Sequence, residues 1–179
     1  EPMQDAKIRA AIAHALDMDA LVAAVYGATA ERHVGLIPTS MRCFRGGTEY
    51  AYDVAKARQL LAESTYGSAE NVPTIVAGTT SEKRDDILFY ELMQEQLMDN
   101  LGLTMDIITW ERGAEEPRDQ LNLFHNSHSW GVVDPSQPLY DEGHSESVTI
   151  VNRAGYVNLE LDAMIQAANL LSWMTPDAA

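Results

Sequence analysis

Apolar residues recur along this chain at two spacings, and each spacing predicts a different kind of element. The helical spacing of i, i+3 and i+4 predicts a first amphipathic helix. Its apolar positions are Ile8, Ala11, Ile12, Ala15 and Leu16. Asp17 and Asp53 then precede two further apolar stretches, as residues that cap helix N-termini do. We therefore expect helices after both aspartates, the first of them ending at Gly27, with a long loop over residues 28–50.

The middle of the chain alternates strand and helix signals. A β-branched run over residues 74–77 predicts a strand, and residues 78–81 predict a turn. Ser81 can cap a long helix that stops at Gly102. We expect this helix to bury Ile87, Leu88, Leu92, Leu97 and Leu101. Alternating residues over 103–107 predict a second, half-buried strand, and residues 121–125 predict a third.

Strand, helix and strand in this order indicate a parallel crossover. A last amphipathic helix carries Leu161, Ile165, Ala168 and Leu171. The sequence thus predicts an α/β fold with a small mixed sheet of about three to five strands flanked by helices. Thr175-Pro176 has the form of another helix start just before the last residue, so we expect residues 1–179 to be a single truncated lobe of a larger protein.

Charge narrows the choice of partners. The formal net charge is -15 at pH 7, and a field of that sign repels phosphates, which argues against nucleic acid and anionic membrane surfaces. No apolar run approaches the roughly 18 residues that cross a bilayer. The single cysteine, Cys43, excludes an internal disulfide and a cysteine-rich zinc site. We expect it to be an inert, partly buried thiol.

Sequence motifs bear on three classes of function: a binding protein, an enzyme and a protein–protein interaction module. The chain lacks a Gly-x-Ser-x-Gly elbow, a phosphate-binding loop, a dinucleotide glycine fingerprint and a His-Glu-x-x-His pair, so we expect neither an enzyme nor a cofactor. A metal-dependent hydrolase built from His125, His128 and Asp134 is the distant alternative. A protein–protein interaction module would show an exposed apolar stripe, and the sequence shows none.

Some polar residues could still contact a ligand. His125 and His128 have a His-x-x-His spacing with His144 downstream, and imidazole suits nickel, copper and zinc, but such histidines in a polar region are more often solvated. Arg42 and Arg45 could hold a ligand carboxylate in bidentate fashion, or could simply balance nearby acidic residues.

Several blocks of the chain resemble one family, the dipeptide-, oligopeptide- and nickel-binding proteins that serve bacterial ABC transporters. The resemblance begins with Asp5-Ala6-Lys7-Ile8-Arg9 and its paired helices, and includes the loop Gly35-Leu36-Ile37-Pro38. It continues at Tyr52-Asp53 and at Leu101-Gly102-Leu103. Its most specific block comprises His144-Ser145-Glu146-Ser147, Asn152, Gly155-Tyr156, Asn158 and Asp162.

The resemblance implies one lobe of a type II periplasmic-binding-protein-like fold, namely the second lobe of a two-lobed protein that closes on its ligand. It implies a substrate-binding component of an ABC importer, with a peptide or similar small solute as ligand. Its partners would be an ABC permease and the missing first lobe, in the periplasm or outside the cell, with a lipoprotein anchor as one option. A nickel or metal-chelate binding protein is the alternative.

Family members place a tryptophan and an acidic, proline-containing turn against the ligand. Here that loop is Trp130-Gly131-Val132-Val133-Asp134-Pro135. Peptide binders often carry an aspartate three residues after the tryptophan, whereas this chain has Val133 there and Asp134 one position later. Trp130 could stack on a ligand or pack under its loop, and Asp134 could pair with a cation or start a turn. The expected ligand contacts are Trp130, Asp134, Arg42, Arg45 and His128.

Overall fold

The computed structural model describes residues 1–46, 50–125, 129, 134–148 and 151–174, with side chains in the last helix described as far as residue 169. The chain separates into two compact units. The first unit combines Glu1–Arg32 with Thr48–His125, and the second combines His33–Gly47 with Asn126–Ala179. Among the described residues, no helix is both long enough and apolar enough to span a membrane.

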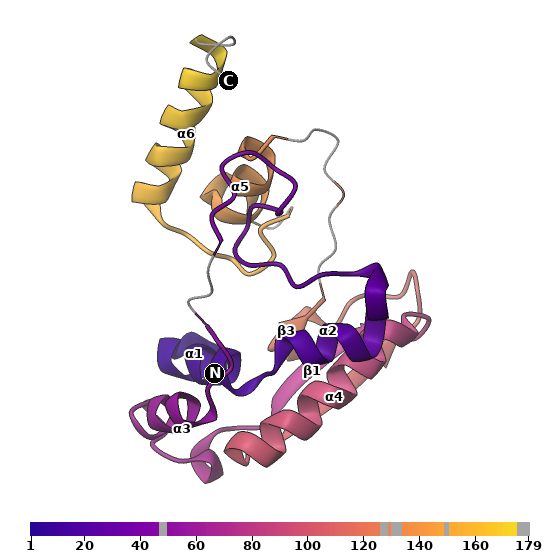
Figure 1. Cartoon of the computed structure of the whole chain (residues 1–179). Helices are drawn as coiled ribbons and strands as arrows, with labels where there is room; N and C mark the ends of the chain where they lie inside the picture. Colours follow the sequence, from indigo (N-terminus) through magenta and orange to yellow (C-terminus); the bar gives the residue numbers. More distant parts are fainter. Residues whose placement is uncertain (47–49, 126–128, 130–133, 149–150, 175–179) are drawn as a thin grey trace. The chain divides into compact units, whose positions relative to one another are not determined.

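The first unit holds four α-helices and all the described strands (Figure 1). In chain order they are α1 (Ala6–Ala15), α2 (Met18–Tyr26), α3 (Val54–Ala62), β1 (Ile75–Thr80), α4 (Arg84–Leu101), β2 (Met105–Trp110) and β3 (Leu123–Phe124). Short 3₁₀ turns lie at Pro2–Gln4, Gly27–Thr29, Ala69–Asn71 and Arg118–Gln120. The expected aspartate caps are confirmed: Asp17 accepts the backbone N–H of Ala20 at 3.0 Å, and Asp53 accepts that of Lys56 at 2.9 Å.

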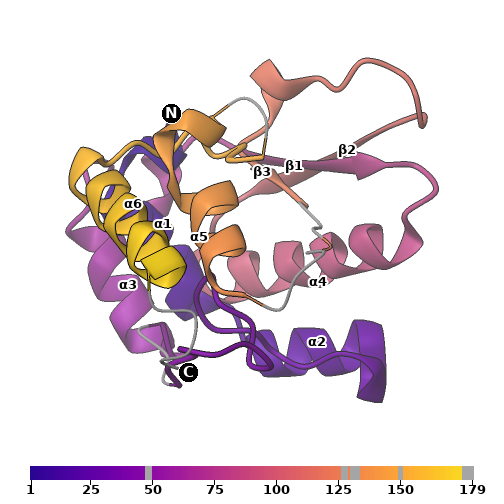
Figure 2. The same ribbon diagram turned by 90° about the horizontal axis from the view of Figure 1, so that it is seen from above.

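The sheet has the order β2-β1-β3, and both of its ladders are parallel. Ile75 is in register with Met105, and Ala77 is in register with Leu123. The three strands run side by side with α4 along one face (Figure 2). The expected parallel crossover through the long helix is therefore confirmed, as is a small sheet flanked by helices. The pairings among the described strands are all parallel.

The strand β1 is longer than the sequence predicted. It continues through Gly78 to Thr80, where a turn was expected. The reason is close packing: a Cβ on Gly78 would lie 2.6 Å from Leu121 Cδ2 and 2.8 Å from Trp110 Cζ3. Gly78 therefore allows neighbouring side chains to approach the strand closely. From the sequence alone, a glycine at this position predicts a turn instead.

The start of α4 also differs from the prediction. Ser81 does not cap it, because the helix begins at Arg84 and the backbone N–H of Ser81 donates to the carbonyl oxygen of Trp110 at 2.8 Å. Leu88, expected in the core, is 41% exposed. The helix instead buries Asp86, Tyr90, Met93, Leu97 and Leu101. Its end at Gly102 is confirmed, with a left-handed φ of 72° that favours glycine.

Two side chains of α4 hold the corner between α1 and α2. Gln96 Oε1 accepts the backbone N–H of Asp17 at 2.7 Å, and Asn100 Nδ2 donates to the carbonyl oxygen of Ala15 at 2.8 Å. The apolar core lies beneath this corner and is continuous with the buried residues of the sheet. Its fully buried large members are Ile8, Leu21, Ile75, Leu97 and Leu103. The corner is thus fixed by polar bonds at its rim and by apolar burial below.

The second unit holds α5 (Ser136–Gly143), a 3₁₀ turn (Ser145–Ser147) and α6 (Leu159–Met174). His144 was expected to be solvated, and this is wrong: it is 1% exposed, stacks on Tyr140 with ring centroids 4.7 Å apart, and accepts the backbone N–H of Glu146 at Nδ1. Cys43 was expected to be partly buried, but it is exposed, at a positive φ of 65°.

The buried polar residues of the second unit form one network. Asn152, 1% exposed, donates from Nδ2 to the carbonyl oxygens of His144 and Tyr156, and its Oδ1 accepts the backbone N–H of Tyr156. Asp162 accepts both the hydroxyl and the backbone N–H of Ser145. The most specific block of the resemblance is therefore a structural network, in a unit whose described residues include few buried apolar side chains.

Candidate functional site

The carboxyl ends of two parallel strands meet at one edge of the sheet in the first unit. The strand β1 ends at Thr79 and Thr80, and His125 directly follows β3. In open α/β sheets, ligands bind outside the carboxyl ends of the strands. The chain continues from His125 into the loop that carries His128 and Trp130, and these two expected ligand contacts lie outside the described residues. The edge at His125 is the described feature nearest to them in sequence.

Four polar side chains converge at this edge, and Asp86 is at their centre. Its Oδ2 accepts the hydroxyl of Thr79 at 2.8 Å and lies 3.5 Å from Lys83 Nζ. Its Oδ1 lies 2.6 Å from Nδ1 of His125. Asp86 itself is only 6% exposed. We call Thr79, Lys83, Asp86 and His125 the carboxyl-edge cluster.

Local structure explains why a carboxylate is stable in this buried position. Asp86 lies in the first turn of α4, where the unpaired backbone N–H groups and the helix dipole favour negative charge. Each of its oxygens has a hydrogen-bonding or charged partner, so burial leaves no lone acceptor. The cluster is therefore a satisfied and preorganised polar site.

The contact with Asp86 also orients the ring of His125. A carboxylate can only accept a hydrogen bond, so Nδ1 of His125 carries the proton and Nε2 is left as an acceptor in the neutral ring. The side chain of His125 is 37% exposed. An imidazole held by a carboxylate through one nitrogen is the arrangement that metal-ligating histidines use. His125 can thus accept a hydrogen bond or coordinate a metal through Nε2.

Two tyrosines lie near the cluster and remain neutral. Burial, followed by the negative charge of Asp86, raises the pKa of Tyr90, whose hydroxyl donates to the carbonyl oxygen of Gly78 at 3.5 Å. Burial and the charges of Asp86 and Asp85 likewise raise the pKa of Tyr26. Both phenols stay protonated, so Asp86 supplies the buried negative charge of the cluster.

The second unit brings together two of the expected contacts. Arg42 Nη2 lies 3.5 Å from Asp134 Oδ2, with the side chains 63% and 36% exposed. The hydroxyl and backbone N–H of Ser136 lower the pKa of Asp134, and Arg42 lowers it further. An exposed pair of this length contributes little to stability, so both groups can be given up to a ligand. Arg45 is exposed and has no ion pair among the described residues.

The described residues do not assemble a metal centre. They contain no group of three or more His, Cys, Asp or Glu side chains able to hold an ion. His125 and His144 belong to different units, and Nδ1 of His144 already accepts the backbone N–H of Glu146. Sequence reasoning missed Thr79, Lys83 and Asp86. Their positions in the sequence were the available signal. Polar residues at the end of a strand and at the start of the following helix lie close together at the carboxyl edge of a parallel sheet.

A comparison with protein families matches residues 1–147 to a model described as bacterial extracellular solute-binding proteins, family 5 Middle. Heme-binding protein A of Haemophilus influenzae is 29% identical over 93% of this chain and 31% of its own length. Glutathione-binding protein GsiB of Salmonella typhimurium is 33% identical over 94% of this chain and 34% of its own. The chain thus spans about a third of the length of these relatives.

Solved structures show the same fold. The periplasmic binding protein DppA of Helicobacter pylori, in complex with peptide STSA, superposes with a TM-score of 0.78 at 20% identity, over 94% of this chain and 33% of that one. NikZ of Campylobacter jejuni, in complex with Ni(L-His), gives 0.76 at 17% identity, over 94% and 36%. The expected periplasmic-binding-protein fold is confirmed.

Proposed function

Because the chain belongs to the family-5 bacterial extracellular solute-binding proteins, we propose that it forms part of the substrate-binding component of an ABC importer, capturing a peptide or similar small solute. The match over residues 1–147 carries this proposal. The relatives are named as heme-binding and glutathione-binding proteins, which supports binding without catalysis. We place the protein in the periplasm or outside the cell, where a lipid anchor could hold it at the membrane. Its proposed partner is an ABC permease.

We assign the solute surface of this chain to two places. One is the carboxyl-edge cluster with the following loop, which includes Trp130 and His128. The other is the second unit's Arg42, Arg45 and Asp134, which can offer a cation or an anion to a zwitterionic solute. The first place is supported by the partly exposed ring of His125, which Asp86 orients, and the second by the exposed, long pair of Arg42 and Asp134.

In the proposed mechanism, this chain supplies one of the two surfaces that close on the ligand. A ligand drives closure only through its differential affinity for the closed form, and that affinity comes from contacts on both lobes. The proposed first lobe would supply the other contacts. On this argument the 179-residue chain alone binds its solute weakly, since it gives part of the contacts and none of the closure.

Solution NMR of the isotopically labelled 179-residue chain tests the proposal, because the method detects weak binding. The chain is titrated in turn with a tetrapeptide, glutathione, heme and nickel with L-histidine. We expect one class to move the amide signals of Thr79 and His125, and we expect His125→Ala to weaken that response. Arg112→Ala, a change at an exposed residue paired with Glu82, is the matched control. Shifts confined to other regions, or none with any class, would count against the proposal.

A metal chelate is the second candidate solute, and the Asp86–His125 contact favours it. The carboxylate leaves Nε2 of His125 able to coordinate, while the chelator would supply the other ligands. Nickel with L-histidine is compared with L-histidine alone on the same chain. If this candidate is right, only the metal-containing titration moves His125, and Asp86→Asn weakens it; equal responses to both would eliminate the metal chelate and leave the organic solute.

A further inference from the structure

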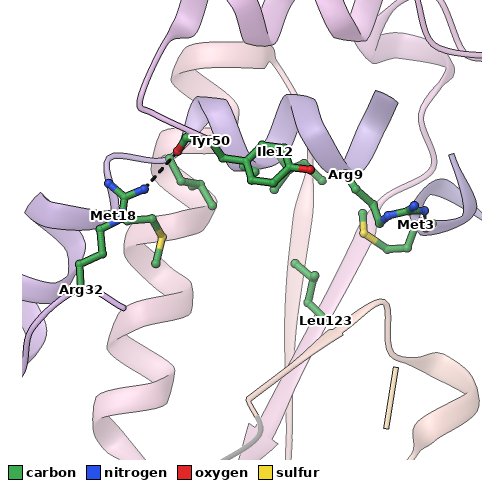
Figure 3. Close-up of a pocket in the computed structure, with 9 residues that line it drawn as sticks. Met3, Arg9, Ile12, Met18, Arg32, Tyr50 and Leu123 are labelled. Carbon is green, nitrogen blue, oxygen red and sulfur yellow. Dashed lines mark hydrogen bonds between the residues drawn. The ribbon is translucent and has the colours of Figure 1, made fainter. Parts of the chain in front are cut away.

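A separate cavity of about 350 Å³ lies within the first unit. The helix α1 contributes Arg9, Ile12 and Ala13 to its wall, and Leu123 of β3 faces them (Figure 3). This volume falls within the roughly 300–1,000 Å³ of small-molecule sites. None of the residues of the carboxyl-edge cluster lines it, so the solute site proposed above and this cavity are distinct.

The lining of the cavity is apolar except at its two arginines. Figure 3 shows Arg9 beside Met3 and Arg32 beside Met18, on opposite sides of the view, with Ile12 and Tyr50 between them. Among the residues that the structure describes, no carboxylate lines the cavity. The chain as a whole has a formal net charge of -15. The two arginines give this cavity the opposite charge, which favours a negatively charged ligand.

Backbone carbonyls hold both guanidinium groups without neutralising them. Arg9 Nη1 donates to the carbonyl oxygen of Met3 at 2.7 Å, and Arg32 Nη2 donates to that of Tyr50 at 3.1 Å. Arg32 also lies 3.4 Å from Asp19, a carboxylate that is 75% exposed and therefore a weak competitor. Arg9 has no ion pair among the described residues. Each arginine thus keeps N–H groups for an incoming carboxylate.

We propose that this cavity binds an amphipathic carboxylate, with its apolar body against Ile12 and Leu123 and its anionic end on Arg9 or Arg32. The apolar wall contributes affinity through burial, and the guanidinium groups contribute selection for the anion. This site does not depend on solute capture at the carboxyl edge, because it uses other residues.

Two methionines allow a direct test. Met3 and Met18 line the cavity, whereas Met98 and Met164 are exposed elsewhere on the chain. The chain is labelled with ¹³C at its methionine methyl groups and titrated with octanoate. We expect the signals of Met3 and Met18 to shift in a saturable way while those of Met98 and Met164 stay in place. A uniform response of all four, or none, would overturn the proposal.

Matched ligands and variants separate charge from apolar contact. Octanol has the same chain without the charge, and we expect it to bind about tenfold more weakly than octanoate. Arg9→Gln combined with Arg32→Gln should remove that preference, and Arg112→Gln should keep it. Ala13→Leu should fill the cavity and abolish binding, with Met93 in the core reporting that the fold is intact. Equal binding of both ligands, or unchanged binding by the Ala13→Leu chain, would refute the carboxylate site.

Discussion

The carboxylate of Asp86 lies 2.6 Å from Nδ1 of His125, although the two residues are 39 positions apart in the chain. The contact joins the first turn of α4 to the end of β3, two elements that otherwise meet through the sheet. It therefore fixes the point from which the loop after His125 departs, and the orientation of the one described histidine at the carboxyl edge.

Removing the carboxylate should destabilise the first unit. Asp86→Ala leaves Thr79 and His125 without their partner and takes a satisfied group from a buried position. We expect a loss of about 2–3 kcal/mol in the free energy of unfolding. Urea unfolding followed by circular dichroism measures it. Asp85→Ala, at the exposed neighbouring position in the same helical turn, is the control and should cost much less; equal losses would mean that the contacts of Asp86 contribute nothing specific.

Replacing asparagine by aspartate should destabilise the second unit at buried Asn152 and have little effect at exposed Asn158. Asn152→Asp removes the two bonds that Nδ2 donates to the carbonyls of His144 and Tyr156 and buries a charge beside them. A loss of about 2–4 kcal/mol is expected. Asn158→Asp makes the same chemical change at an exposed position, where Oδ1 accepts backbone N–H groups and Nδ2 donates to the hydroxyl of Tyr156, which can itself donate to a carboxylate. This change should be tolerated. Thermal unfolding compares the two, and similar melting temperatures would contradict the network.

Stability should fall in acid partly through Asp5. The backbone N–H and the hydroxyl of Thr65 lower the pKa of Asp5 from 3.8 to about 2, and the bonds from Lys7 and Ile8 add to this. A pKa that is lower in the folded chain means that Asp5 stabilises the fold above 3.8, and that this contribution is lost as pH falls from 3.8 toward 2.

Comparing the parent chain with Asp5→Asn checks this pH dependence. The difference in melting temperature should be largest near pH 7 and should shrink as pH falls toward 2. Asp99→Asn, at an exposed position of α4, is the matched control for the change of carboxylate to amide. A constant difference between the parent and Asp5→Asn across this range would show that the titration of Asp5 is not linked to folding.

The close approach at Gly78 should make even a methyl group costly. A Cβ there would lie under 3.0 Å from atoms of both Leu121 and Trp110, so the two side chains must move together. We expect Gly78→Ala to destabilise the chain by about 1–3 kcal/mol and to change the fluorescence of Trp110. Gly46→Ala, where nothing lies within 4 Å of the added Cβ, is the control. An unchanged stability at Gly78 would show that this packing is adaptable.

The helices of the first unit could be predicted because their signals are local. The apolar spacing of α1 and the capping aspartates at positions 17 and 53 need no knowledge of the rest of the chain. The predictions failed where contacts with residues distant in the sequence determine the local structure. Gly78 has the pattern of a turn until Leu121 and Trp110 are seen beside it, and Ser81 has the pattern of a cap until its backbone N–H is seen on Trp110.

The candidate site shows the same division. The sequence identified His125 as a possible ligand residue, and it identified Arg42 and Asp134, which the fold places 3.5 Å apart. It did not identify Asp86, because an acidic residue in the first turn of a helix is ordinary unless a distant residue, here His125 after β3, is known to contact it. His144 was misjudged for a related reason, since a polar segment is assumed to be solvated unless its hydrogen-bond partners are known. As ligand contacts, all of the expected residues stay predictions: Trp130, His128, Arg42, Arg45 and Asp134.

The hydrogen bond from Arg32 to the carbonyl oxygen of Tyr50 has a consequence for the order of folding. It joins the two points at which the chain leaves and re-enters the first unit, so the intervening stretch is tethered at both ends before it has its own partners. Those partners belong to Asn126–Ala179, which are synthesised after the first unit. Since domains form as units during synthesis, the first unit is complete first, and it presents His33–Gly47 as a closed loop on which the remaining residues assemble.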